Sequence, residues 1–248
     1  MTQNIYDQEN FFQGYARLPR SISGLDAAPE WPSLRAQLPA RLGRVVDLGC
    51  GYGWFARWAR QSGAASVFAL DVSEKMLARA RVTTVDPAIS YERADLEMLE
   101  LPAGSFDLAY SSLALHYIAN LDRLIATVSR AVVPGGAFVF SIEHPLLTAP
   151  TVQEWLPHPA GHTIWPLDSY LDEGSRTRDW LASGVIKQHR TLATYLNTLV
   201  RHGFVIRHVE EWGPSAADLA AHPEWAKDHQ RPPFLLVSAR RQAPDVTP

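Results

Sequence analysis

Hydrophobic and polar positions in this chain alternate between short apolar runs and amphipathic stretches. The apolar runs predict five buried strands, each closed by a glycine or a polar residue, over residues 45–48, 65–70, 89–92, 106–111 and 137–142. The amphipathic stretches predict helices over residues 54–61, 74–81 and 121–132. Ser73 is a suitable N-cap for the second of these helices. Strands that alternate with helices indicate an α/β fold with a parallel sheet covered on both faces.

Two segments break this alternation, and both are predicted to cover the site. Prolines interrupt residues 1–40, which we expect to form a lid of short helices. Residues 144–190 are rich in proline and aromatic residues and show no clear period, which favours a long substrate cover. A helix over 191–202 and two strands over 204–212 and 234–239 complete the predicted elements. The whole chain, 1–248, is predicted to be a single domain with a frayed tail at residues 242–248.

Composition narrows the class of protein. The chain has 248 residues, of which 46% are hydrophobic, enough for one sizeable core. The net charge of −3 gives no reason to expect nucleic acid or a membrane as a partner. The single cysteine, Cys50, excludes an internal disulfide, and the N-terminus lacks the layout of a signal peptide. We therefore expect a cytoplasmic protein acting on a small-molecule substrate, with its oligomeric state left open.

A glycine-rich loop follows the first predicted strand. Gly49, Gly51 and Gly53 give the spacing G-x-G-x-G, in which bare backbone lets a ligand approach closely. The dinucleotide fingerprint is G-x-G-x-x-G, and here Trp54 occupies its last position. Asp47 also lies inside the strand end, where its charge disfavours a phosphate. The loop therefore favours S-adenosylmethionine (SAM), which carries no pyrophosphate, over NAD.

Two further carboxylates close the next strands. Asp71 lies 20 residues after Gly51, where it can accept hydrogen bonds from both ribose hydroxyls. This geometry serves SAM and NAD alike. Asp95 follows the third strand, where it can bind an adenine amino group while Leu96 offers its backbone N–H to the ring.

These segments resemble, in order and spacing, the motifs of class I SAM-dependent methyltransferases of the type 11 small-molecule group. The resemblance covers residues 44–145 and is carried by VVDLGCGYGWFARWAR, ALDVSEKMLARAR, YERADLEMLELPAGSFDLAYSSLALHYI and SRAVVPGGAFVFSIEHP. It implies a Rossmann-like, seven-stranded, mostly parallel sheet in the order 3-2-1-4-5-7-6. It also implies that Gly49, Cys50 and Gly51 bind the methionine part, and that Ser111 lies beside the sulfonium. The predicted cofactor site further includes Tyr15, Asp47, Trp54, Val72 and Met76.

Three residues after the fourth and fifth strands are candidates for catalysis. His116 follows the fourth strand, and Glu143 and His144 follow the fifth, so all three are expected near the reaction centre. If the acceptor is a hydroxyl or an acidic ring N–H, one of them can act as a base, with His189 as a further candidate. If the acceptor is a neutral amine, positioning alone suffices. A structural role is the alternative for each histidine.

No metal site is predicted. His158 and His162 are four residues apart, but the intervening Pro159 argues against a helix and no cysteine completes a ligand set. The sequence thus predicts a SAM-dependent methyltransferase, with S-adenosylhomocysteine (SAH) as its product. The expected acceptor is a nitrogen or oxygen of a planar or heterocyclic metabolite. An NAD-type oxidoreductase and a non-catalytic SAM-binding protein remain as alternatives.

Overall fold

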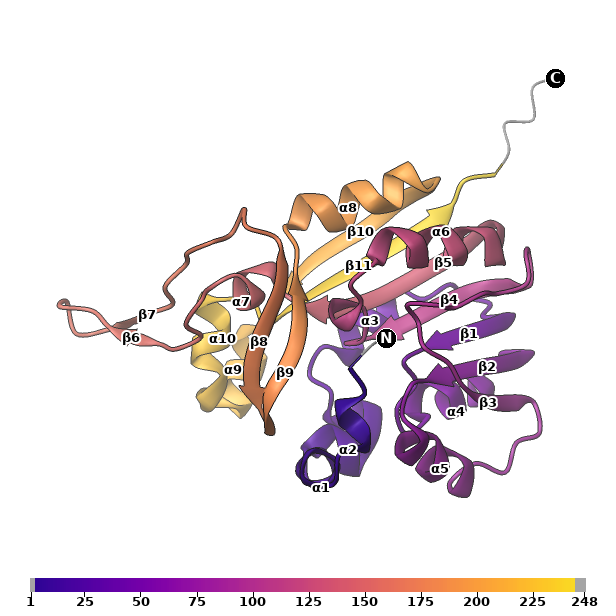
Figure 1. The fold of residues 1–248 in the computed structure, drawn as a ribbon, viewed down its shortest axis with the longest axis horizontal. Helices are drawn as coiled ribbons and strands as arrows, with labels where there is room; N and C mark the ends of the chain where they lie inside the picture. Colours follow the sequence, from indigo (N-terminus) through magenta and orange to yellow (C-terminus); the bar gives the residue numbers. More distant parts are fainter. Residues whose placement is uncertain (1–2, 244–248) are drawn as a thin grey trace.

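A seven-stranded sheet crosses the centre of the molecule (Figure 1). The computed structural model describes residues 3–243. Its strand order is β10-β11-β5-β4-β1-β2-β3. All neighbouring strands are parallel except β11, which runs antiparallel to both β5 and β10. The predicted order 3-2-1-4-5-7-6 is confirmed. The strands of this sheet are β1 Arg44–Leu48, β2 Ser66–Asp71, β3 Ile89–Arg93, β4 Phe106–Ser112, β5 Val132–Glu143, β10 Phe204–Trp212 and β11 Phe234–Arg241.

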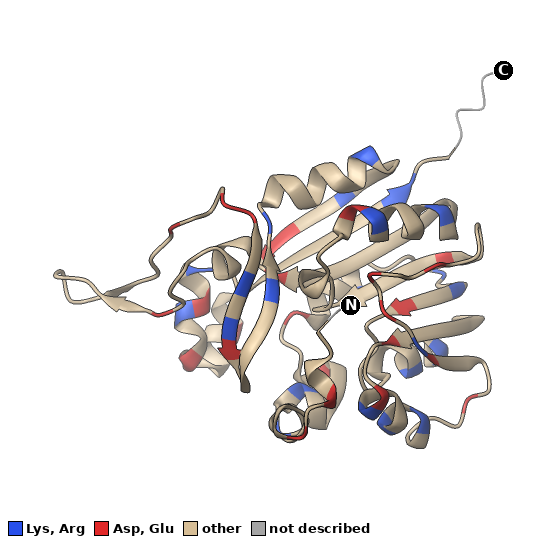
Figure 2. Ribbon diagram, viewed as in Figure 1, with Lys and Arg blue, Asp and Glu red and all other residues tan. Residues whose placement is uncertain are grey.

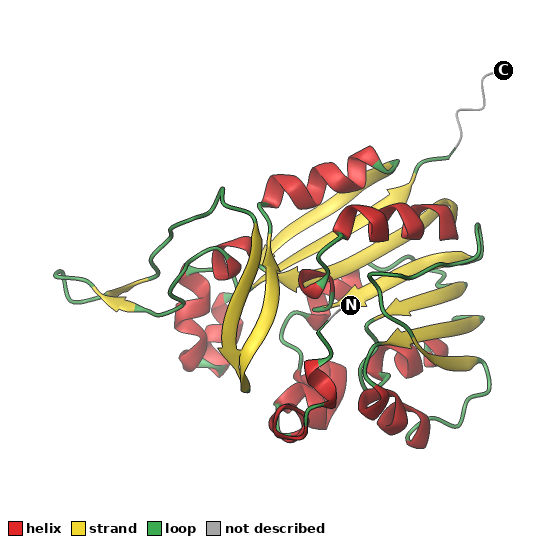
Figure 3. Ribbon diagram, in the orientation of Figure 1, coloured by secondary structure: helices red, strands yellow, loops and turns green. Residues whose placement is uncertain are grey.

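Helices cover both faces of the sheet (Figure 3). Because successive side chains of a strand point to opposite faces, each strand supplies two cores. Val46 of β1 belongs to a core that includes α6 Leu121–Ala131 and α8 Leu192–Arg201. Its neighbour Val45 belongs to the opposite core, which is closed by the remaining helices flanking the sheet, α3 Trp31–Ala36, α4 Trp54–Gln61 and α5 Glu74–Val82.

The local signals in the sequence place most elements of this sheet. The predicted N-cap of α5 is confirmed, since the Ser73 hydroxyl accepts a hydrogen bond from the Met76 N–H at 3.2 Å. The prediction for the fifth strand is wrong in one respect. The apolar run places the start of this strand at residue 137, but β5 already begins at Val132, ahead of Gly135 and Gly136. Its pairing with β4 shifts register between Phe106 and Leu108, so the glycines form an irregularity within the strand.

The segment predicted to lack regular structure contains two hairpins. Strands β6 Leu156–Pro157 and β7 Thr163–Ile164 form one hairpin, and β8 Gly174–Trp180 and β9 Ala182–His189 form the other. A short helix, α7 Pro145–Thr148, precedes them. The period of β8 is hidden in the sequence because its half-buried positions include Arg176 and Arg178 rather than apolar residues. These two guanidinium groups bind main-chain carbonyls of residues 148–150 instead of packing in a core.

The N-terminal segment lies beside the β8–β9 hairpin (Figure 1). Ile5 and Phe11 pack against Val185 of β9 in a small separate core. The segment is helical, as predicted, and consists of the short elements η1 Ile5–Asp7, α1 Glu9–Ala16, α2 Pro19–Ser23 and η2 Gly24–Ala27. No element was predicted between β10 and β11, where the structure has α9 Ala216–Ala221, η4 Pro223–Trp225 and α10 Ala226–Gln230.

Candidate active site

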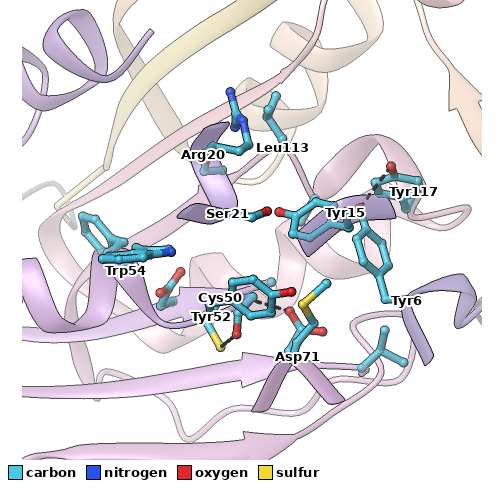
Figure 4. A pocket seen from close by; sticks show the side chains of 18 of the residues that line it. Tyr6, Tyr15, Arg20, Ser21, Cys50, Tyr52, Trp54, Asp71, Leu113 and Tyr117 are labelled. Atoms are coloured by element: carbon cyan, nitrogen blue, oxygen red, sulfur yellow. Dashed lines mark hydrogen bonds between the residues drawn. The ribbon is translucent and has the colours of Figure 1, made fainter. Parts of the chain in front are cut away.

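A cavity of about 370 Å³ opens at the carboxyl ends of the parallel strands. Ligands of open α/β sheets bind at this edge, because the loops that follow the strands converge there. Its floor includes the end of β1 and the glycine loop, and its roof includes residues of α1, α2 and the β8–β9 hairpin. Figure 4 shows Tyr15 and Ser21 of the roof facing Cys50 and Asp71 across this space.

The glycine loop has a backbone that side chains would obstruct. Gly49 has φ +80°, and a Cβ built on it would lie 2.5 Å from the Cβ of Ala114. Gly53 has φ +72°, and its Cβ would lie 2.2 Å from the Tyr91 hydroxyl. Gly51 also has a positive φ, of +53°, but no atom lies within 4 Å of its Cβ position. The three glycines therefore permit a sharp turn whose middle residue faces open space.

Asp71 is fixed by the backbone on both of its oxygens. It accepts hydrogen bonds from the Gly51 N–H at 2.8 Å and from the Ser73 N–H at 2.9 Å. Burial raises the pKa of Asp71 to about 6, although these two N–H groups act in the opposite direction. The carboxylate thus joins the glycine loop to the end of β2 and lines the cavity in a fixed orientation.

Asp47 is a buried carboxyl that lacks a partner on one oxygen. The residue is 2% exposed, lines the cavity, and has no hydrogen bond to its Oδ2 among the described residues. Burial raises its pKa well above the ordinary range, and the charge of Asp71 adds to this effect. A bound cation would offset both effects, since an opposite charge favours the ionised form. Burial also raises the pKa of the Cys50 thiol, which keeps it protonated.

The other end of the cavity has aromatic walls around one ion pair. Glu143, at the end of β5, accepts a hydrogen bond from the Lys187 ammonium at 2.5 Å. That ammonium lies 4.9 Å from the ring centroid of Trp180 and 5.9 Å from that of Tyr117. The Tyr6 hydroxyl bonds to the Tyr117 hydroxyl at 3.2 Å (Figure 4). These residues give the cavity an aromatic wall beside the Glu143 carboxylate.

The structure brings most of the predicted site residues to this one cavity. Those that line it are Tyr15, Asp47, Gly49, Cys50, Gly51, Trp54, Asp71, Val72, Met76, Asp95, Leu96, His116 and Glu143. Ser111 does not line it, because its hydroxyl points into the core and donates to the Leu48 carbonyl at 2.8 Å. The next residue, Ser112, lines the cavity instead, since adjacent strand residues face opposite ways.

Two of the histidines considered as bases lie outside the cavity lining. His144 is the N-cap of α7, where its Nδ1 accepts the Leu146 N–H at 3.1 Å and its Nε2 lies 2.9 Å from Glu211. Both ring nitrogens of His189 are also engaged. They lie 2.8 Å from the Thr148 hydroxyl and 2.9 Å from the Tyr170 carbonyl. His144 thus joins α7 to β10, and His189 joins segments within the cover, so neither presents a free nitrogen to the cavity.

Arg20 is a cavity residue that the sequence reasoning missed. It is held in α2 by Glu30, whose two carboxylate oxygens each lie 3.1 Å from one guanidinium nitrogen. The Glu30 side chain is 1% exposed and the Arg20 side chain 24%, so the carboxylate of this pair is buried while the guanidinium is partly exposed. In the sequence, Arg20 and Glu30 are simply a basic and an acidic residue ten positions apart in a segment interrupted by prolines. That spacing follows no helical or strand period, so nothing indicated a contact.

The distribution of charged, metal-binding and apolar residues bears on whether the chain has further sites. Acidic and basic residues are interspersed over the ribbon (Figure 2). Residues 3–243 contain no group of three or more His, Cys, Asp or Glu side chains arranged to bind a metal ion. Within the same residues, no helix combines the length and the apolar character needed to cross a bilayer.

Comparisons with known proteins identify the family. Residues 46–140 match the family model described as a methyltransferase domain. A crystal structure of an S-adenosylmethionine-dependent methyltransferase from Mesorhizobium loti is 59% identical, covers 88% of this chain and 100% of that one, and superposes with a TM-score of 0.85. A putative S-adenosylmethionine-dependent methyltransferase from Listeria monocytogenes is 40% identical over 88% of this chain and 99% of its own, with a TM-score of 0.81.

More distant relatives match a smaller part of the chain. Malonyl-[acyl-carrier protein] O-methyltransferase from Enterobacter lignolyticus is 40% identical over 44% of this chain and 43% of its own length. Trans-aconitate 2-methyltransferase from Deinococcus radiodurans is 38% identical over 47% of each. The full-length similarity, the strand order and the cavity at the glycine loop agree on SAM as the cofactor, rather than NAD. The chain belongs to the family of S-adenosylmethionine-dependent methyltransferases.

Proposed function

We propose that this enzyme transfers the methyl group of SAM to a nitrogen or oxygen atom of a planar or heterocyclic small molecule. The observation that carries the proposal is that the aromatic residues Tyr6, Tyr117 and Trp180 line the cavity together with the Glu143 carboxylate, which is bonded to Lys187. Aromatic walls favour a flat ligand, and a single polar group fixes its orientation. A cavity of about 370 Å³ suits a small acceptor rather than an extended polymer.

The other end of the cavity is assigned to the cofactor. In this assignment Gly49, Cys50 and Gly51 contact the methionine part, and Asp71 accepts hydrogen bonds from the ribose hydroxyls. Asp95 and Leu96 bind the adenine. Val72, Met76 and Trp54 supply apolar contacts around the nucleoside, and Tyr15 closes this end from above. All of these residues line the one cavity, which supports the assignment.

The amino-acid portion of SAM carries an ammonium and a carboxylate, and the cavity has a group suited to each. We assign Asp47 to the ammonium, because a cation would give the unpartnered Oδ2 a partner and favour ionisation. We assign Arg20 to the carboxylate, because this residue lines the cavity and its guanidinium has donors beyond those used by Glu30. SAM binding would then place both charges against fixed partners.

Bound SAM supplies a methyl group already activated by its positive sulfur. The protein therefore needs mainly to orient the acceptor and exclude water. Holding two reactants in a near-attack geometry can contribute about 7–11 kcal/mol in favourable cases. The lid and the β8–β9 hairpin close over the cavity and would keep water out during transfer.

The second candidate for the methyl acceptor is a carboxylate group, which is suggested by the names of two relatives. One relative is named for malonyl-[acyl-carrier protein] and another for trans-aconitate. The cavity offers an argument against it. Glu143 lies at the end of the cavity proposed to hold the acceptor, and although burial raises its pKa, positive charges nearby, among them the hydrogen-bonded Lys187 ammonium, bring that pKa below the ordinary value. An ionised Glu143 would repel an anionic acceptor.

The test uses SAM labelled in its methyl group with a cell metabolite extract. We expect label in a low-molecular-mass product that is soluble in organic solvent. The Asp71→Ala variant is the control, because it removes the proposed ribose ligand and should abolish labelling. Label that appears only in protein or nucleic acid would contradict the proposal. Binding of SAM without any labelled product would favour a non-catalytic role.

A further inference from the structure

His116 is oriented by the backbone of the neighbouring strand. The Glu143 N–H donates a hydrogen bond to its Nδ1 at 3.3 Å. A ring nitrogen that accepts this bond carries no proton. The imidazole is 1% exposed, and burial lowers its pKa to about 4, so the ring is neutral at pH 7. A neutral imidazole with a bare Nδ1 must carry its proton on Nε2.

This tautomer makes His116 a hydrogen-bond donor to the cavity that it lines. Its one lone pair is engaged by the Glu143 amide, so it has no free nitrogen with which to accept a proton. His144 and His189 lie outside the lining and are bound on both nitrogens. Among the described residues, Glu143 is therefore the proton acceptor available at this end of the cavity.

Glu143 is held with one oxygen engaged and one available. Its Oε1 bonds to Lys187, which is itself 5% exposed and packed on Trp180 and Tyr117. The carboxylate side chain retains 17% exposure and lines the cavity. Lys187 thus acts as a positioning residue. An ammonium partner makes a carboxylate a weaker base. Glu143 is therefore better suited to removing an acidic proton than to removing the proton of a simple alcohol.

We propose that the acceptor end selects an uncharged planar molecule in which an acidic X–H group, with X being nitrogen or oxygen, stands beside a conjugated hydrogen-bond acceptor. Glu143 receives the bond from X–H, and the His116 Nε2–H donates to the adjacent acceptor atom. Lactams and hydroxy-heteroaromatic compounds have this pattern. The inference rests on the proposed function and names its substrate class.

The proposed step balances without a further reactant. An electron pair of X forms the new bond to the methyl carbon, while the S–CH3 bond breaks and its electron pair remains on sulfur. The X–H proton passes to Glu143 and then to water. The His116 Nε2–H bond stabilises the negative charge that develops on the conjugated atom as the proton leaves.

The first test measures the binding of small probes to SAH-saturated protein by calorimetry. We expect the lactam α-pyridone to bind about tenfold or more tightly than its O-methyl ether, which lacks the donor, and than phenol, which lacks the acceptor. Trans-aconitate should bind more weakly than α-pyridone because of its charge. Equal or tighter binding of the ether or of trans-aconitate would overturn the inference, as would no binding of α-pyridone.

The second test separates donation from proton acceptance at His116. His116→Gln keeps an N–H at the position of Nε2, so its α-pyridone affinity should stay within about threefold of the original. His116→Phe removes the donor and should lose about tenfold. His208→Gln, at an exposed position on β10, is the matched control and should show no change. A Gln variant as weak as the Phe variant would contradict the assigned role.

Nitrogen NMR of histidine-labelled protein gives a readout independent of any acceptor. We expect the His116 proton on Nε2 at pH 7, and a proton on Nδ1 would overturn the inference. SAH binding and the labelled-extract assay report separately on the proposed function. If the extract assay gives a labelled small-molecule product but α-pyridone does not bind, the proposed substrate class is wrong and the proposed methyl transfer is still supported.

Discussion

At the scale of single residues, Asp71 links cofactor affinity to pH. Its pKa of about 6 means that the carboxyl of the free protein is protonated below that pH. A protonated carboxyl loses acceptor capacity, so the hydrogen bonds to the ribose require the ionised form. SAH affinity should therefore fall as the pH is lowered through about 6, by up to about tenfold for each pH unit below it.

Calorimetry with SAH between pH 5 and pH 8 measures this effect. The Asp71→Asn variant should bind more weakly at every pH and show a flatter profile. An unchanged SAH affinity across the range in the original protein would show that Asp71 does not contact the cofactor in its ionised form.

Gly49 is the residue where a single methyl group should be most disruptive. Gly49→Ala forces a side chain into a left-handed backbone and 2.5 Å from the Cβ of Ala114. We expect the free energy of unfolding to fall by about 2–5 kcal/mol. Gly63→Ala is the matched control, because Gly63 has φ +92° with open space around it. The free energy of unfolding of this variant should fall only by the cost of the left-handed backbone, about 1–2 kcal/mol. Equal losses in urea unfolding would show that the contact with Ala114 is unimportant.

Some residues near the cavity could be predicted from the sequence and others could not. The positions of Gly49, Gly51, Asp71 and Asp95 at the cavity were predictable, because each lies at or just after the end of a strand that its own neighbours specify. Ser111 and Ser112 were not separable, since the face of a strand depends on which helix packs against it. His144 was taken for a site residue because it follows β5, but its ring turns away to cap α7.

At the scale of elements, the N-terminal segment is bonded to the start of α5 through Asp7 and packs on the β8–β9 hairpin through Phe11. Phe11 is fully buried, with ring centroids 4.8 Å from Tyr6 and 5.4 Å from Trp180. Phe11→Ala should remove about 3 kcal/mol of packing and open the lid locally while the sheet stays folded. Hydrogen exchange of the α1 amides should then be about a hundredfold faster.

The matched control for the lid is Ile22→Ala, at a side chain that is 64% exposed. This variant should leave the exchange of α1 unchanged. If Phe11→Ala instead accelerates exchange equally in the central strands β1 and β4, the lid and the sheet unfold as one unit, and the local-opening model is wrong.

The elements of the sheet were predictable because their signals are local. An apolar run, a closing glycine or aspartate and an N-cap such as Ser73 each act within a few residues. The β8–β9 hairpin was not, because the inward-facing Arg176 and Arg178 conceal its alternation. Their role depends on carbonyls contributed by α7 and the residues that follow it, which is information that no local window contains.

At the scale of the whole molecule, cofactor binding should stabilise the fold, because the cavity joins segments from both ends of the chain. SAH at a hundred times its Kd should add about 2.7 kcal/mol to the free energy of unfolding. For a domain of this size, that corresponds to a rise in Tm of about 5–11 °C. Scanning calorimetry tests this, with Asp71→Asn expected to show a much smaller rise. An unchanged Tm in the original protein would contradict the assigned cofactor site.

The packing of Ile5 and Phe11 on Val185 also has a consequence for biosynthesis. Translation adds about 5–20 residues per second, and the glycine loop is complete long before the hairpin emerges from the ribosome. During that interval Phe12 and Tyr15 can already contact Tyr52, but Ile5 and Phe11 still lack their partners in the hairpin and stay open to chaperones. The roof over the glycine loop therefore forms late, so the nascent protein should acquire tight SAM binding only after the β8–β9 hairpin has been synthesised.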